Sequence, residues 1–233
     1  KVTPEMKVIL NEKYGLDKPL SEQYEIYMKN LLKGDLGESM QFRGREVKET
    51  IKYSFPKSAK LGVVAVVFSL AVGTLLGIVS ALKSGKLPDK LCMFISTLGI
   101  TVPSFVIGAV LIYFFTVEWK LLPAVGLKGP SSYIMPVIAL AGSSMAFITR
   151  LTRSKLIDVL KSDYIRTAKA KGLSSKIVIF KHALRNSLIP VVTYLGPLIA
   201  SILTGSFVVE KIFVVPGLGN EFVSTITNRD YTS

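Results

Sequence analysis

The longest uncharged stretch of the chain, Leu61–Leu82, places the strongest constraint on its fold. It holds twenty-two residues without a charge. As an α-helix it is about 33 Å long, enough to cross a bilayer core of about 30 Å. The whole chain is 49% hydrophobic with a mean hydropathy of +0.46, which is typical of membrane proteins rather than of soluble domains. The sequence therefore predicts an all-α polytopic membrane protein.

Three more uncharged runs are predicted to span the membrane, at 91–115, 133–149 and 188–209. Pro103 and two glycines interrupt the first of these runs, and a membrane helix tolerates such residues where neighbouring helices satisfy the freed backbone groups. Before the first span, residues 1–60 are polar. Apolar residues recur there at helical spacing in Leu16–Leu32, and Glu46–Tyr53 is a candidate short helix.

Positive charge predicts the topology of the four spans. Residues 150–187 carry ten Lys or Arg against two Asp or Glu, and such basic loops face the cytoplasm. The loop 83–90 then also lies inside, while 1–60, 116–132 and 210–233 lie outside. An external segment 1–60 requires a span before it, and a last span is expected after 210–233. The full protein is thus expected to have six spans, four of them in this chain.

Several classes of function are disfavoured by what the sequence lacks. The formal charge of +13 lies in blocks between apolar runs, which points to membrane topology rather than to nucleic-acid binding. One cysteine, Cys92, and one histidine, His182, provide neither a disulfide framework nor a metal cluster. No GxxxxGK[ST] phosphate-binding loop occurs. We expect no catalytic residues, no metal and no cofactor in this chain.

The cytoplasmic segment 162–190 is basic and divided in two. Asp163 is predicted to cap a helix that begins near Tyr164, Gly172 to end it, and Ser174 to cap the next helix. Apolar side chains of the second helix recur at i, i+4, i+7 and i+11 and predict one stripe, made of Leu173, Ile177, Phe180 and Leu184. Such a segment either rests on anionic membrane lipid or docks into a groove of a cytoplasmic partner.

The run RTAKAKGLSSKIVIFKHALRNSLIPV, which begins at Arg166, resembles the EAA motif of ATP-binding-cassette importer permeases. More narrowly, it is similar to the oligopeptide and dipeptide (peptide/nickel) branch. Supporting matches are GDLGES at Gly34–Ser39, PKSAKLG at Pro56–Gly62, and VPGLGNEF with NRDY within Val215–Tyr231. The chain has Arg166 where the general motif has Glu, so no contact of that Glu can be assigned.

The resemblance implies an importer-permease helical bundle in the cell membrane of a prokaryote. It also implies the partners: a second homologous permease, two cytoplasmic ATPases that bind ATP and Mg, and an external binding protein that delivers the peptide substrate. The residues expected to couple this chain to the ATPases are Arg166, Thr167, Ala168, Gly172, Leu173, Ser174, Ile177, Phe180 and Leu184. Nickel chelates, glutathione or another small solute are alternative cargoes, and a receptor or scaffold that transports nothing is an alternative class.

Two further groups of residues are candidates. Hydroxyl groups within the spans predict a neutral polar path, lined by Thr97, Thr101, Ser104, Ser143, Ser144, Thr193 and Thr204. Alternatively, such hydroxyls bond the carbonyls of their own helices. External turns predict a gate or a contact with the binding protein, formed by Asp35, Gly37, Pro216, Gly217 and Gly219. Plain tight turns explain these five residues equally well.

Overall fold

The computed structural model describes residues 8, 11, 15, 17–39, 42, 44–127, 129–203 and 206–230. The chain divides into two compact units. One contains Lys1–Tyr53 and Phe222–Ser233, and the other contains Ser54–Glu221. Within the described residues, regular structure is helical, and β pairing is limited to one isolated bridge between Glu38 and Glu46. The expected all-α class is confirmed.

The smaller unit contains helix α2, Leu20–Leu32. It begins directly after Pro19 and lies within the stretch Leu16–Leu32, where the sequence showed apolar residues at helical spacing. Beyond α2, the Ser39 hydroxyl donates a hydrogen bond to the Asp230 carboxylate. This contact joins the two chain segments that make up the unit.

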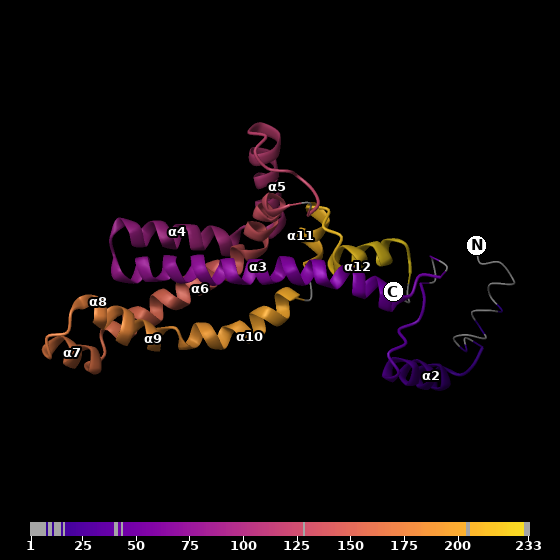
Figure 1. The fold of residues 1–233 in the computed structure, drawn as a ribbon, viewed down its shortest axis with the longest axis horizontal. Coiled ribbons are helices and arrows are strands. Elements are labelled where there is room, and N and C mark those ends of the chain that lie inside the picture. Colours follow the sequence, from indigo (N-terminus) through magenta and orange to yellow (C-terminus); the bar gives the residue numbers. More distant parts are fainter. Residues whose placement is uncertain are drawn as a thin grey trace. The chain divides into compact units, whose positions relative to one another are not determined.

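The larger unit is built on helices long enough to cross a membrane (Figure 1). Helix α3 runs continuously over Val47–Leu82 with Pro56 inside it, so Glu46–Tyr53 is not a separate short helix as predicted. Pro130–Leu160 is the second such helix and consists of the 3-10 turn η2, Pro130–Tyr133, followed by α6, Ile134–Leu160. In the described part of the chain, two bent helix pairs also qualify if each pair is one span.

The first bent pair lies where Pro103 interrupts the predicted span 91–115. Helix α4, Leu87–Thr101, ends because Val102 adopts an extended conformation, as a residue before proline commonly does. Helix α5, Ser104–Ile112, and the π-helix η1, Tyr113–Glu118, then follow. The chain turns by 106° between the two helical parts, and Figure 1 shows this change of direction. A proline at the break therefore gives two half-length helices.

The second bent pair, Ser175–Ser187 with Ile189–Leu203, includes the second half of the segment 162–190. After α7, Asp163–Ala170, the chain forms α8, Ser175–Ile177, the π-helix η3, Val178–Ala183, and α9, Leu184–Ser187. Helix α10, Ile189–Leu203, continues from α9 with a bend of 43°. Two short helices end the described chain, α11, Phe207–Ile212, and α12, Leu218–Thr227.

Helix α6 lies at the centre of the larger unit because glycines let its neighbours approach its backbone. A Cβ added at Gly73 of α3 would lie 2.8 Å from the Met145 carbonyl oxygen. A Cβ at Gly99 of α4 would lie 2.6 Å from the Gly142 carbonyl oxygen. Small residues of this kind allow close helix packing in membranes, where the apolar surface of a helix gains little by leaving lipid.

Gly77 gives the sharpest test of this packing. A Cβ there would lie 2.5 Å from the Thr152 Cβ and 2.8 Å from the Thr149 carbonyl oxygen. We expect Gly77→Ala to force α3 and α6 apart and to destabilise the protein by about 1–3 kcal/mol. The measurement is the temperature at which the detergent-solubilised protein loses its monodisperse gel-filtration peak.

Gly196→Ala on α10 is the matched control, because no atom of the described residues outside the adjacent helix backbone lies within 4 Å of a Cβ added there. We expect this change to leave the transition temperature unchanged or to raise it slightly, since alanine favours helix. Equal transition temperatures for the two variants would contradict the close-packing argument.

Candidate functional site

The segment between α7 and α8 turns at Gly172, as predicted. Gly172 has φ +79°, its N–H donates to the Lys169 carbonyl at 3.0 Å, and the Leu173 N–H donates to the Ala168 carbonyl at 3.3 Å. These two bonds are those of a Schellman motif. Among the described residues other than its two chain neighbours, no atom lies within 4 Å of a Cβ added at Gly172. The glycine is therefore required for its backbone conformation and not for lack of space.

The caps of the two helices agree only partly with prediction. Helix α7 begins at Asp163 itself and Ser162 takes the cap position, whereas Asp163 was predicted to be the cap. The carboxylate of Asp163 still lies in the first turn, where its negative charge interacts favourably with the positive end of the helix dipole. Ser174 occupies the cap position of α8, as expected.

The predicted apolar stripe divides into an exposed part and a buried part. Leu173, Ile177 and Phe180 are 38%, 44% and 66% exposed, whereas Leu184 is 8% exposed. The single stripe was wrong at Leu184 because residues 178–183 form a π-helix, which changes the angular spacing from that of an α-helix. The exposed part of the predicted stripe therefore consists of Leu173, Ile177 and Phe180, which we call the loop-tip surface.

A buried cluster holds the loop against the ends of α3 and α6. Its members come from α3, α6, α7, η3 and α9, and they are Ala81, Leu156, Ile165, Ala168, Val178, Ala183 and Leu184. Of the other predicted coupling residues, Arg166 and Thr167 are exposed. The Thr167 hydroxyl donates to the Asp163 carbonyl at 3.0 Å. The loop-tip surface thus rests on a packed base.

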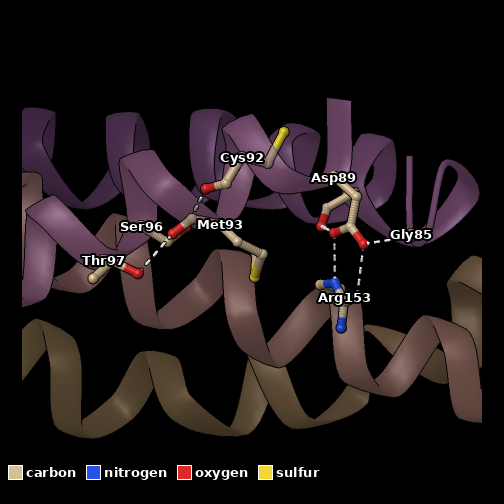
Figure 2. A network of polar contacts seen from close by, with 8 residues as sticks. Gly85, Asp89, Cys92, Met93, Ser96, Thr97 and Arg153 are labelled. Atoms are coloured by element: carbon tan, nitrogen blue, oxygen red, sulfur yellow. Dashed lines mark hydrogen bonds and ion pairs between the residues drawn. The ribbon is translucent and has the colours of Figure 1, made fainter. Parts of the chain in front are cut away.

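An ion pair next to this base joins three helices (Figure 2). Arg153 of α6 donates from Nε to Asp89 Oδ1 at 2.7 Å and from Nη2 to Asp89 Oδ2 at 2.8 Å. The Ser80 hydroxyl of α3 also donates to Oδ1, and the Gly85 N–H donates to Oδ2 at 2.8 Å. Asp89, the first acidic residue of α4, is only 3% exposed. We call this arrangement the Asp89 clamp.

Sequence reasoning missed the Asp89 clamp because it treated Asp89 and Arg153 only as loop charges. The useful signal was Asp89, the one acidic residue within the basic loop 83–90. It indicates an ion pair with a basic residue but does not identify that residue. The pair also joins two segments that the charge pattern placed on the cytoplasmic side. This agreement supports the predicted topology.

The described candidate path residues lie on four different helices, α4, α5, α6 and α10. Thr97, Thr101, Ser143 and Thr193 are exposed, Ser104 is half-buried and Ser144 is buried. Thr204 lies outside the described residues. The hydroxyls of Thr97, Thr101 and Thr193 donate to the carbonyls four residues earlier, at 2.8, 2.9 and 3.1 Å. These three residues thus bond their own helices, as the alternative interpretation expected, and a role in a path stays a prediction.

The predicted gate glycines surround a buried carboxylate. The Ser58 hydroxyl donates to Glu210 Oε1 at 2.7 Å, and the Asn220 N–H donates to Oε2 at 3.1 Å. A Cβ added at Gly217 would lie 2.5 Å from Glu210 Oε2, and one at Gly219 would lie 2.7 Å from the Phe207 Cα. Glycine is therefore needed at both positions, because a side chain would collide with Glu210 at Gly217 and with Phe207 at Gly219.

The remaining gate candidates are less constrained. Pro216 is exposed. In the smaller unit, the Gly37 N–H donates to Asp35 Oδ1 at 2.9 Å, and Gly37 has φ +82°, so a local turn accounts for these two residues. Within the described residues, no three His, Cys, Asp or Glu side chains are placed to hold a metal ion.

Comparison with known proteins gives the context of these features. Residues 73–233 match the family model described as "Binding-protein-dependent transport system inner membrane component". The chain is 47% identical to a dipeptide transport system permease protein of Bacillus subtilis, over 94% of this chain and 71% of that protein. It is 44% identical to an oligopeptide transport system permease protein of Haemophilus influenzae, over 98% of this chain and 76% of that protein.

Solved structures share the fold at low sequence identity. The chain is similar to a methionine ABC transporter in inward-facing conformations, with a TM-score of 0.60 and 16% identity over 75% of this chain and 79% of that one. It is also similar to an amino acid ABC transporter, with a TM-score of 0.60 and 17% identity over 79% and 82% of the two chains. The chain thus shares its helical fold with chains of these two transporters.

The chain belongs to the family of binding-protein-dependent transport system inner membrane components, and its relatives named above are dipeptide and oligopeptide permeases. It is a permease component, and no catalytic role follows from its family. The peptide branch expected from the sequence is confirmed.

The Asp89 clamp yields a prediction about stability. Removing one partner leaves the other as a largely buried, unpaired charge, which costs about 3–5 kcal/mol. We expect Asp89→Asn and Arg153→Met each to lower the melting temperature of the purified protein. In the double variant Asp89→Asn with Arg153→Met, the melting temperature should fall by less than the sum of the two single decreases, because neither charge is then left unpaired.

The exposed ion pair between Glu25 and Lys29 on α2 provides the control, with Lys29 Nζ 2.6 Å from Glu25 Oε1. Exposed pairs contribute little to stability, so Glu25→Gln should leave the melting temperature nearly unchanged. Additive losses in the Asp89 and Arg153 double variant would show that the two side chains do not act as a pair.

Proposed function

We propose that this chain is a transmembrane permease subunit of an ATP-driven importer of dipeptides or oligopeptides in a prokaryotic cell membrane. The observation that carries the proposal is 44–47% identity over nearly the whole chain to dipeptide and oligopeptide permeases. Peptides are favoured over nickel chelates or glutathione because these relatives are peptide permeases. An external binding protein delivers the peptide, and a second permease subunit completes the path.

The energy source lies in the partner subunits. The sequence contains no phosphate-binding loop, so two cytoplasmic ATPase subunits bind ATP and Mg, and they contact this chain at the loop-tip surface. The loop-tip surface presents three exposed apolar side chains on a packed base. Docking in an apolar groove of a protein is favourable for such side chains, because it removes their surface from water. The basic residues around them remain free to contact acidic groups or lipid headgroups.

In this mechanism the loop moves together with the helices on which it is packed. The buried cluster joins the loop to α3 and α6, and the Asp89 clamp joins α3, α4 and α6 at the same end. A displacement of the loop by closing ATPases is therefore passed to three helices as one body. The loop-tip surface receives the displacement, and the bent helices then open the path to one side of the membrane or to the other.

The test is peptide uptake by proteoliposomes that contain the complete complex, the external binding protein and internal ATP. We expect ATP-dependent uptake of a radiolabelled dipeptide or tripeptide by the wild-type complex. A complex that hydrolyses ATP and takes up none of the peptides bound by its binding protein would overturn the proposed cargo.

Phe180→Asp tests the contact with the ATPases. A carboxylate in an apolar groove is left without hydration or a partner, so we expect uptake to fall by roughly tenfold or more. Gly172→Pro should have a similar effect, because proline cannot adopt the φ of +79° found there. Membrane insertion of both variants should stay normal.

Tyr27→Asp is the matched control, since Tyr27 is a 57% exposed aromatic residue in the other unit. The Tyr27→Asp variant should insert into the membrane normally, and its ATP hydrolysis should still drive peptide uptake. Wild-type uptake by both Phe180→Asp and Gly172→Pro would rule out the loop-tip surface as the coupling contact.

A further inference from the structure

Arg150 is a cation within a membrane-length helix and has no carboxylate partner among the described residues. It lies in Pro130–Leu160, one turn before Arg153, and it is exposed. Arg153 is neutralised by Asp89. Arg150 donates from Nη2 to the Thr97 hydroxyl at 2.8 Å, a neutral acceptor. A charged side chain in such a helix faces the bundle interior or a water-filled cavity by preference, because contact with lipid tails is costly.

The direction of the Arg150 side chain argues against contact with lipid headgroups. Helices α4 and α6 are antiparallel, with Asp89 beside Arg153 and Gly99 beside Gly142. By that register Arg150 lies level with about Cys92, so Thr97 is roughly 7 Å farther along α4, away from the loop 83–90. An arginine that snorkels extends toward the nearest headgroups, which on the predicted topology lie at the loop. Arg150 extends the opposite way.

The surroundings of Arg150 resemble a path more than a lipid-facing surface. Ser143, Phe147 and Arg150 are exposed at i, i+4 and i+7 on α6 and therefore share one face. The Phe147 ring packs against the Tyr194 ring of α10 in a tilted arrangement, with a centroid distance of 4.4 Å. Thr97 is one of the predicted path residues. One face of α6 thus combines a hydroxyl, an aromatic pair and a single positive charge.

We propose that Arg150, positioned by Thr97, binds the terminal carboxylate of the peptide during its passage. The proposal rests on the proposed function. Peptides of any sequence share this carboxylate, so one cation serves cargoes whose side chains differ, and a guanidinium matches a carboxylate in a bidentate manner. On this proposal the path carries one positive charge, whereas the sequence predicted a neutral path because Arg150 had been assigned to the loop that follows the span.

The first experiment asks whether position 150 faces water. The complete complex is reconstituted with Arg150→Cys or Thr97→Cys and treated with a charged methanethiosulfonate reagent, which reacts with a hydrated thiol. We expect both variants to be labelled, and labelling to slow when trialanine-loaded binding protein and ATP are present. The unsubstituted complex gives the background for this chain, because its one cysteine, Cys92, is buried.

The second experiment asks whether the charge acts on the cargo. Trialanine is the probe because its carboxylate is the terminal one. We expect Arg150→Gln to lower trialanine uptake per ATP hydrolysed by roughly tenfold, the range of a charge-assisted hydrogen bond, and Arg150→Lys to retain most of it. On Arg150→Cys, an aminoethyl methanethiosulfonate reagent should restore uptake, whereas the neutral methyl reagent should not.

Lys155→Gln is the matched control, since Lys155 is an exposed cation on the same helix and should leave uptake per ATP unchanged. Wild-type uptake by Arg150→Gln, or absence of labelling at both substituted positions, would overturn the proposal. Labelling without protection by peptide would also overturn it. If the unsubstituted complex imports no peptide, the proposed function fails, and the labelling experiment still reports whether position 150 faces water.

Discussion

The close contact of α6 with glycines of α3 and α4 is the constraint on which the larger unit depends. Helices in lipid gain little from apolar burial, so backbone approach and polar contacts must hold them together. Because Gly73, Gly77 and Gly99 lie against α6, short and directional contacts become possible between these helices. The Asp89 clamp is one such contact.

Features set by local chemistry were predictable from the sequence. The helical class followed from uncharged runs, the break at Pro103 from the extended conformation that proline favours in the residue before it, and the turn at Gly172 from the φ that glycine alone adopts readily. The assignment to a permease family followed from a motif. None of these predictions required knowledge of which helices are neighbours.

Features set by contacts between distant segments were not predictable. Asp89 and Arg153 are 64 residues apart, and Ser58 and Glu210 are 152 residues apart. Leu184 was placed on the exposed stripe because a π-helix cannot be recognised from α-helical spacing. Arg150 was counted as a loop charge, since the end of a span was taken to coincide with its first charge. The structure instead continues α6 to Leu160.

The Schellman turn at Gly172 has a consequence for the kinetics of assembly. Its two hydrogen bonds lie within the loop itself, and the loop base is packed on α3 and α6. The shape of the loop-tip surface is thus set within this chain, so docking of the proposed ATPases would require little ordering of the chain. A surface of this kind can engage and release a partner in each transport cycle without refolding.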